Sequence, residues 1–334
     1  MVTSRQVARG VVRSMRAMDR AAKQAERRRV AHQQALHRQA LLDASARAAS
    51  EYEAIVEALT GAHRITLSRR DWLTTATAPP VQAPARRDDA ERRAAAELEN
   101  YSPGWFTRVL KREERARQAL ADEIDAARAR DDDEHASAVQ AAEAENLRIA
   151  QAQQIVERDP EAMVRALEDH SALADLPFSV EGLDTLFIDG RVVAVVDGLD
   201  LEDMPEESIS LLKSGKASLK AIPVGKRHEL HRDAICSAAV RVAIEFLACL
   251  PIEEVEVVML TDLLDRGTGH IDARPVLHLR VALQALGALN LHRAEPTALV
   301  ERLGGHMDWV RRDGFRAINA AAFGVDLEDE PTRL

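Results

Sequence analysis

Residues 213–280 decide the fold, and they read KSGKASLKAIPVGKRHELHRDAICSAAVRVAIEFLACLPIEEVEVVMLTDLLDRGTGHIDARPVLHLR. A strand is predicted over 216–224 and a helix over 229–250, which a proline ends. Two apolar strands are predicted over 255–260 and 275–281, on either side of a turn that contains two glycines. This stretch is dense in bulky apolar residues, so we expect it to form the folded core.

Further elements flank this core. Two apolar runs, 185–188 and 192–196, flank Asp189-Gly190, which predicts a β-hairpin with a tight turn, and residues 199–209 form an acidic loop. Short helices are predicted near 282–288 and 297–303. We therefore expect an α+β domain over 171–324, in which helices pack on an antiparallel sheet, and an acidic tail over 325–334.

The N-terminal region predicts one long helix. Residues 4–60 contain no proline, and apolar residues recur at alternating steps of three and four, as in a coiled coil. The first section of this seam comprises Val11, Met15, Met18, Ala22 and Ala25; the second comprises Leu41, Ser45, Ala48, Tyr52, Ile55 and Leu59. A helix of this length cannot bury such a seam by itself, so we expect a partner helix.

A basic stripe follows the same spacing on the other side of the first section. Its members are Arg9, Arg13, Arg16, Arg20, Lys23 and Arg27. One interpretation is a solvated face that keeps a coiled coil soluble. The other is a contact strip for an acidic partner, either nucleic acid or the acidic second half of the helical region. The stripe contains no interleaved aromatic residues and belongs to no base-reading motif.

Helix is predicted again over 91–170, after a proline-rich break near 74–90 that reads as a linker or a hairpin tip. Residues 1–170 are therefore expected to form a helical hairpin or coiled coil, which closes within one chain or between two copies. Trp72 is either exposed or packed against the coil. The acidic run Asp131–Glu134 is expected to be solvated surface.

Composition limits the classes of function. The formal net charge is −10, but residues 1–80 hold 14 Lys and Arg against seven Asp and Glu, so the N-terminal region is basic. There is no apolar run long enough to span a membrane and no signal-peptide pattern. Cys236 and Cys249 are too far apart on one helix to form a disulfide, which predicts buried thiols in a reducing compartment, the cytoplasm.

Candidate sites in the core are weak. His228 and His231, with Asp233, Cys236 and His270, are an incomplete set for zinc. Residues 213–216 are too short for a phosphate-binding loop. Ser237 is expected to be packed inside a helix and His278 to be half-exposed. We therefore predict no catalytic residue, no cofactor and no metal.

The core resembles the domain that precedes the nuclease domain in Mrr-type restriction endonuclease-like proteins. The similarity lies in the turn Asp265-Arg266-Gly267-Thr268-Gly269, the returning strand Pro275-Val276-Leu277-His278-Leu279, and the later Leu289-Asn290-Leu291 and Glu295-Pro296. Residues 95–304 also resemble an uncharacterised bacterial coiled-coil protein family, through Tyr101-Ser102-Pro103-Gly104-Trp105-Phe106. About 30 residues follow Gly305, and they lack the metal-binding motif of the Mrr-type nuclease, so the resemblance implies the accessory domain without its enzyme.

Together these observations predict an α-dominated α+β protein with a non-enzymatic function: scaffolding, oligomerisation or recognition. The resemblance implies an accessory role in a bacterial defence or DNA-associated system. The alternative is direct nucleic-acid binding by the basic helix. A weaker alternative is a metal-dependent enzyme that uses His228, His231 and the loop at 213–216. The expected partners are a second copy or another protein bound by the helical arms.

Overall fold

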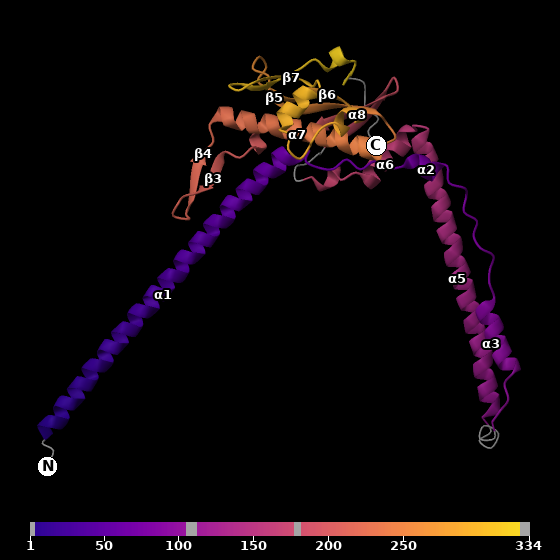
Figure 1. Cartoon of the computed structure of the whole chain (residues 1–334), viewed down its shortest axis with the longest axis horizontal. Helices are drawn as coiled ribbons and strands as arrows, with labels where there is room; N and C mark the ends of the chain where they lie inside the picture. The colour runs from indigo at the N-terminus through magenta and orange to yellow at the C-terminus, as the bar shows by residue number, and fades with distance from the viewer. Residues whose placement is uncertain (1–3, 105–111, 177–181, 328–334) are drawn as a thin grey trace. The chain divides into compact units, whose positions relative to one another are not determined.

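The computed structural model describes residues 4–104, 112–176 and 182–327, except for the side chains of residues 1–25, 27 and 175 (Figure 1). The chain divides into two compact units. Unit 1 comprises Met1–Leu67, Ala172–Glu245 and Glu253–Leu334, and unit 2 comprises Ser68–Ser171 and Phe246–Ile252. The predicted class, a helix-dominated α+β fold with a long N-terminal helix, is confirmed. The units divide the sequence differently from the predicted boundaries, because the first helix belongs with the sheet.

Unit 1 contains α1 (Ser4–Gly61), η1 (Leu173–Asp175), η2 (Leu201–Asp203), α7 (Val224–Cys249, its last residues counted with unit 2), α8 (Leu283–Gly287), α9 (Pro296–Arg302) and η3 (Ala320–Phe323). Its strands are β1 (Leu183–Ile188), β2 (Arg191–Asp197), β3 (Glu207–Leu211), β4 (Ala217–Ala221), β5 (Glu254–Leu264), β6 (Ile271–Ala282), β7 (His306–Val310) and β8 (Gly314–Arg316). Unit 2 contains α2 (Trp72–Ala76), α3 (Asp89–Glu99), α5 (Glu113–Val156) and α6 (Pro160–His170).

The main sheet has the strand order β1-β2-β5-β6-β7-β8. The predicted hairpin between β1 and β2 is present, and Asp189 and Gly190 both have the positive φ angles that its tight turn requires. The expectation of a purely antiparallel sheet is wrong, since β2 and β5 run parallel. Parallel neighbours need a crossover connection, and here the chain between them includes β3, β4 and α7.

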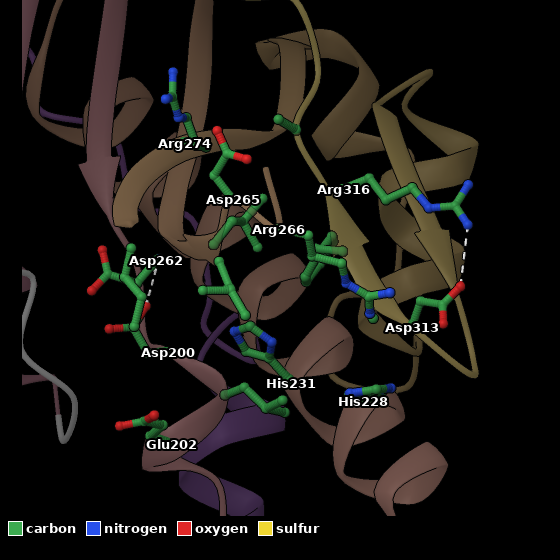
Figure 2. Close-up of a pocket in the computed structure, with 17 residues that line it drawn as sticks. Asp200, Glu202, His228, His231, Asp262, Asp265, Arg266, Arg274, Asp313 and Arg316 are labelled. Atoms are coloured by element: carbon green, nitrogen blue, oxygen red, sulfur yellow. Dashed lines mark hydrogen bonds and ion pairs between the residues drawn. The ribbon is translucent and has the colours of Figure 1, made fainter. Parts of the chain in front are cut away.

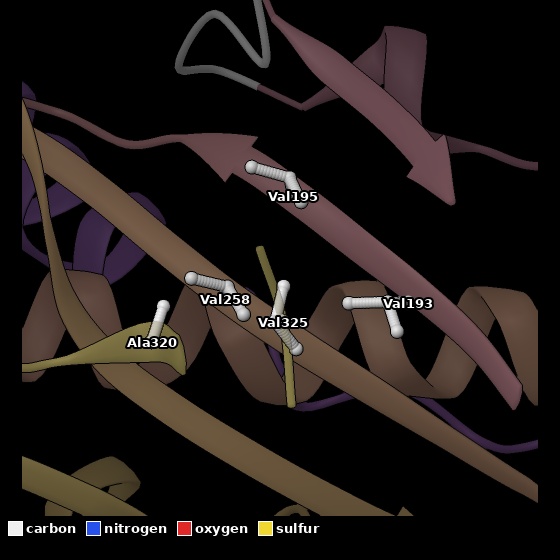
Figure 3. Packing of buried hydrophobic residues seen from close by; sticks show 5 residues of the cluster. All are labelled: Val193, Val195, Val258, Ala320 and Val325. Atoms are coloured by element: carbon white, nitrogen blue, oxygen red, sulfur yellow. The ribbon is translucent and has the colours of Figure 1, made fainter. Parts of the chain in front are cut away.

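Both faces of the central strands are covered. Ile235 of α7 and Met259 of β5 approach each other beside Gly198, on the α7 face. On the other face, η3 and the residues that follow it pack on the sheet through a cluster shown in Figure 3: Val193, Val195, Val258, Ala320 and Val325. Double-sided burial explains why the middle of β2 is a continuous apolar run rather than an alternating one.

Strands β3 and β4 form a separate two-stranded sheet that lies against α1. Residue Leu42 of α1 approaches the turn of this hairpin at Gly215. Isolated two-stranded hairpins are marginally stable in water, so α1 supplies support that the hairpin needs. The sequence predicts a strand of the core domain in the β4 region and a loop in most of the β3 region. Strand β3 is missed because the run Ser208-Ile209-Ser210-Leu211 is short and weakly apolar.

Unit 2 is built around α5. The chain from Ala76 to Glu91 runs antiparallel along this helix: Gln153 Nε2 donates to the carbonyl of Ala76 (3.0 Å), and Arg86 Nε donates to Asp132 (2.6 Å). Between these points the Asn146 amide accepts from the N–H of Val81 (2.8 Å) and donates to its carbonyl (2.9 Å). The proline-rich segment is thus neither a free linker nor a hairpin tip.

The first carboxylate of the acidic run is buried. Asp131 accepts hydrogen bonds from the backbone N–H groups of Ala90 (3.2 Å) and Glu91 (2.9 Å), and these bonds lower its pKa. It therefore caps the N-terminus of α3, where Asp88 makes no side-chain capping bond. The expectation that all of residues 131–134 are solvated surface is wrong at Asp131, because the cap comes from a residue 40 positions away.

Trp72 is buried in unit 2. Its indole N–H donates to the carbonyl of Cys249, and its ring lies 5.5 Å from that of His170. Of the two alternatives left open by the sequence, the packed one is correct. Residues 105–111 of the helical stretch predicted over 91–170 lie outside the described residues, and α5 runs unbroken from Glu113 through the acidic run.

Candidate functional site

Helix α1 is only partly packed within unit 1. The side chains that it buries or half-buries begin at Leu42, and most of them share one face: Leu42, Ser45, Ala48, Ala49, Tyr52, Val56, Leu59 and Thr60. Ala58 is half-buried on another side of the helix. Four of the six residues in the second section of the predicted seam are buried or half-buried: Ser45, Ala48, Tyr52 and Leu59. Leu41 and Ile55 are exposed instead, and the residues that follow them, Leu42 and Val56, are half-buried. From Glu26 to Leu41, every described side chain is exposed.

Four large apolar side chains described on α1 are exposed; Leu36 lies on one side of the helix, and the other three lie together on another. Val30, Leu41 and Ile55 leave 42%, 53% and 51% of their surface exposed. At 100° per residue, these three positions fall within about 40° of one another around the helix axis. We call Val30, Leu41 and Ile55 the α1 stripe. The helix has 58 residues, which corresponds to about 87 Å, and over Glu26–Leu41 its described side chains are all exposed.

The predicted basic stripe lies at the far end of the same helix. Its backbone is helical, but the side chains of Arg9, Arg13, Arg16, Arg20, Lys23 and Arg27 are outside the described residues. Further along the helix, Arg28, Arg29 and Arg38 are exposed, and Arg29 has a single weak ion pair, 4.0 Å from Glu26. The described part of α1 therefore also offers cationic groups to a partner.

The sheet contains a groove of about 800 Å³ at the free end of the β5–β6 hairpin (Figure 2). Asp200, Glu202 and Asp262 lie on one side of it, and Arg266, Arg274 and Arg316 lie toward the hairpin and β8. Apolar side chains also line the groove: Leu201, Leu263, Leu264, Ile271 and Phe315. The groove therefore combines apolar walls with groups of both charges.

The carboxylates of the groove are held by backbone and side-chain donors. Asp200 Oδ1 accepts from the hydroxyl of Thr261 (2.8 Å) and the N–H of Asp262 (2.7 Å). Burial raises the pKa of Asp262, and the negative charge of Asp200 raises it further. Burial also raises the pKa of Asp197, with smaller contributions from the charges of Asp200 and Asp262. The sequence did not single out these residues, because β2 and β5 come together only in the fold.

His228 and His231 lie at the base of the groove on α7 (Figure 2). His228 Nδ1 donates to the carbonyl of Arg311 (3.0 Å), and His231 Nε2 donates to that of Leu199 (2.7 Å). Burial lowers the pKa of His231, which favours its neutral form. Both rings thus have one nitrogen engaged by the backbone, as expected for polar residues that anchor a helix start.

The other parts of the enzyme hypothesis are not brought to the groove. Lys213 and Lys216 lie in the turn of the β3–β4 hairpin, and they do not line the groove. Cys236 is buried, its pKa is raised to about 12 by burial, and its sulfur lies 3.8 Å from the hydroxyl of Thr297. Among the described residues, no group of three or more His, Cys, Asp and Glu side chains has an arrangement that could hold a metal ion.

Ser237 and His63 form a buried serine–histidine pair. Nε2 of His63 donates to the carbonyl of Ala294 (3.1 Å), so Nδ1 accepts from the hydroxyl of Ser237 (3.0 Å). Neither side chain is exposed. Ser237 is packed, as predicted, and the pair fastens the chain just after α1 to α7 instead of facing a cavity.

The expectation that His278 is half-exposed is wrong. His278 is buried beside Glu256 (3.2 Å) and stacks on Phe323 at 4.2 Å between ring centres. Arg191 completes this network by donating to Glu256 (3.0 Å) and to the carbonyl of Gly324 (3.0 Å). The reason is that η3 covers a face of the sheet that the sequence pattern left open.

No family model, no curated protein and no solved structure matches this chain. The resemblance to the Mrr-type accessory domain stays a prediction from its motifs. Within the described residues, no helix is both long enough and apolar enough to cross a membrane.

Proposed function

We propose that this chain is a non-enzymatic scaffold that self-associates through the α1 stripe. The observation that carries the proposal is the exposure of Val30, Leu41 and Ile55 on one side of a 58-residue helix. Helical stability in proteins comes chiefly from packing of an apolar face, so a helix of this length with an uncovered stripe calls for a partner.

The β3–β4 hairpin extends the uncovered surface next to α1. Leu211, Leu212 and Leu219 are each at least half exposed on it. Since contiguous exposed apolar surface marks interaction sites in proteins, the hairpin supports an assembly role for this part of unit 1. Each of its two strands also has an outer edge with which no other described strand pairs, and such an edge favours association with another chain.

Light scattering on the full chain tests the proposal. We expect a mass of at least two chains, and we expect Leu41→Glu with Ile55→Glu to raise the dissociation constant by at least about tenfold, because each charge must be desolvated in the interface. The control variant combines Ala35→Glu and Ala46→Glu, which add the same charge at exposed positions off the stripe. A full chain that stays monomeric over the whole accessible concentration range contradicts the proposal.

A second function, nucleic-acid binding by α1, is favoured by the exposed Arg28, Arg29 and Arg38. Arg9, Arg13, Arg16 and Arg20 extend the same basic character in sequence. Changing these four to Glu abolishes a salt-sensitive mobility shift if the basic stripe binds phosphates, because binding through phosphates weakens steeply with salt. Absence of any shift at low salt excludes this function.

The proposed setting is a bacterial defence or DNA-associated system, and its support is the motif resemblance alone. A reducing compartment, the cytoplasm, is supported by the two cysteines, both of which are free and buried.

A further inference from the structure

Unit 2 contains a pocket of about 340 Å³, which we call the unit 2 pocket. Residues of α2, α5 and α6 line it, together with Arg70 and Asp71 just before α2. Its volume lies within the range of about 300–1,000 Å³ that is typical of sites for small organic molecules. Every residue that lines the pocket belongs to unit 2, so its role does not depend on self-association through α1.

The floor of the unit 2 pocket is apolar and fixed by packing. It consists of Trp72, Ile155, Ala162 and Ala166, none of which is more than 8% exposed. The indole N–H of Trp72 donates to the carbonyl of Cys249, which holds the ring in one orientation. A floor that is already ordered can accept the flat apolar part of a ligand at little further cost in conformational entropy.

The rim of the pocket carries one net positive charge. Three arginines, Arg70, Arg148 and Arg165, stand against two aspartates, Asp71 and Asp169. An apolar floor below a cationic rim matches a ligand that has an apolar body and a negatively charged end.

The three arginines differ in how far their charge is already used. Arg148 donates two hydrogen bonds to the carboxylate of Glu145 (3.0 and 2.6 Å), and Arg165 lies 4.0 Å from Glu161. Arg70 makes no ion pair within the part of the chain that the structure describes. Its guanidinium is therefore the rim cation most available to an anion from solution.

Arg70 also lies next to the apolar floor. Its Cζ atom is 5.8 Å from the centre of the Trp72 ring, and its backbone N–H donates to the carbonyl of Ala248 (2.9 Å). The neighbouring carboxylate of Asp71 accepts from the N–H (2.9 Å) and the hydroxyl (2.5 Å) of Thr74, so both of its oxygens are engaged in capping α2. Burial and the positive charge of Arg70 lower the pKa of His170, which leaves Arg70 as the cation at this end of the pocket.

We infer that the unit 2 pocket binds a small aromatic carboxylate, whose carboxylate pairs with Arg70 and whose ring lies on Trp72 and Ile155. A guanidinium presents parallel N–H groups that fit the two oxygens of a carboxylate. Burial of the ring on the floor adds an apolar contribution that a small inorganic anion cannot make. The remaining rim groups, Gln151 and Gln154, are exposed amides that can donate to the same carboxylate.

Isothermal titration calorimetry with three ligands tests the two parts of the pocket separately. Indole-3-acetate carries both a carboxylate and a flat ring, indole-3-acetamide replaces the carboxylate with a neutral amide, and acetate has the carboxylate without the ring. We expect indole-3-acetate to bind with a dissociation constant on the order of 0.1 mM, and each of the other two to bind at least about tenfold more weakly.

Each contrary result overturns the inference. An amide that binds as tightly as the carboxylate shows that the positive charge is not used. Acetate that binds as tightly as indole-3-acetate shows that the apolar floor is not used. Absence of binding of indole-3-acetate at millimolar concentration removes the site.

The variant Arg70→Gln tests where the carboxylate binds. The side chain is exposed and the backbone bond to Ala248 is kept, so the fold should be retained, and thermal melting checks this. Indole-3-acetate should bind at least about tenfold more weakly to this variant, while the weak binding of indole-3-acetamide should not change. The control is Arg115→Gln, which makes the same charge change at an exposed position of α5 outside the pocket and should bind like the native chain. Unchanged binding in Arg70→Gln, or an equal loss in both variants, overturns the inference.

Discussion

Helices α1 and α5 are both long, rich in alanine and highly charged, yet their surroundings within their own units differ. Helix α5 is covered by α3, by α2 and by the extended segment that follows α2. Among the described side chains of helix α1, those from Leu42 onward pack in part on the hairpin and the rest of unit 1, and those from Glu26 to Leu41 are exposed. The difference lies in the neighbouring sequence, because prolines at 79, 80 and 84 keep a segment extended beside α5, and α1 has no such segment.

An extended segment is an efficient cover for a helix. Extended chain advances about 3.3 Å per residue and α-helix about 1.5 Å, so a few residues of the segment span many residues of α5. Five residues separate Val81 from Arg86, whereas their partners Asn146 and Asp132 are 14 residues apart. A short extended segment thus covers a long part of α5, while Val30, Leu41 and Ile55 of α1 stay exposed within unit 1.

The largest expected effect is at Trp72. Changing it to Ala should lower the free energy of unfolding by about 3–5 kcal/mol, because a large buried side chain is removed beside α5. Trp72 lies in α2, which packs on α5. A comparable truncation on α1, Leu36→Ala, should alter the free energy of unfolding by less than about 0.5 kcal/mol, since Leu36 is exposed. Chemical denaturation followed by circular dichroism measures both. Equal losses would remove the contrast between the helices.

His63 tests how the packed end of α1 is attached. Its replacement by Ala leaves the Ser237 hydroxyl and the Ala294 carbonyl without their buried partner, which should cost about 2 kcal/mol. Replacement of His37, which is exposed on α1 itself, should have little effect. A silent His63→Ala variant would mean that α1 is held mainly by its apolar face.

The lowered pKa of His63 predicts that the free energy of unfolding depends on pH. Burial lowers the pKa of His63 below its usual value of about 6.5, so the unfolded chain takes up the proton more readily than the folded one. Stability is therefore complete above about pH 6.5 and declines as the pH falls through the folded pKa. Burial lowers the pKa of His231 as well, so His63→Ala should reduce the slope of stability against pH without removing it. If the slope of stability against pH is unchanged in His63→Ala, the lowered pKa of His63 does not contribute to it.

Asn146 tests how the extended segment that follows α2 is held against α5. Asn146→Ala removes both hydrogen bonds to the backbone of Val81 and should cost about 1 kcal/mol. Gln118→Ala is the control, because Gln118 bonds only to Asp122 of the same helix in the open. Limited proteolysis at Arg86 and Arg87 should accelerate in the first variant alone.

The smallest expected effect is at Asp131. Backbone N–H groups lower the pKa of this carboxyl, so its contribution is present above its usual pKa and is lost as the pH falls through the lowered value. At neutral pH, Asp131→Ala should lower the melting temperature by a few degrees, and Asp133→Ala, at an exposed neighbour, should not. In strong acid the native chain and the Asp131 variant should melt alike, and a persistent difference would exclude the capping role.

The sequence by itself determined the elements whose signals are local. The period of apolar residues predicted α1, α7, β5 and β6, and Asp189-Gly190 predicted the β1–β2 turn, because side-chain spacing and positive φ angles are properties of neighbouring residues. The two buried free cysteines followed from their separation on one helix.

Only the tertiary structure decided the contacts between residues distant in the chain. The parallel pairing of β2 with β5 brings Asp200 to Asp262, η3 buries His278, and Asp131 caps a helix 40 residues away. The exposure of Leu41 and Ile55 of α1, where the residues that follow them, Leu42 and Val56, are half-buried, is of the same kind. Both sets of residues satisfy the heptad spacing, and the choice between them depends on which face the β3–β4 hairpin and the sheet domain cover.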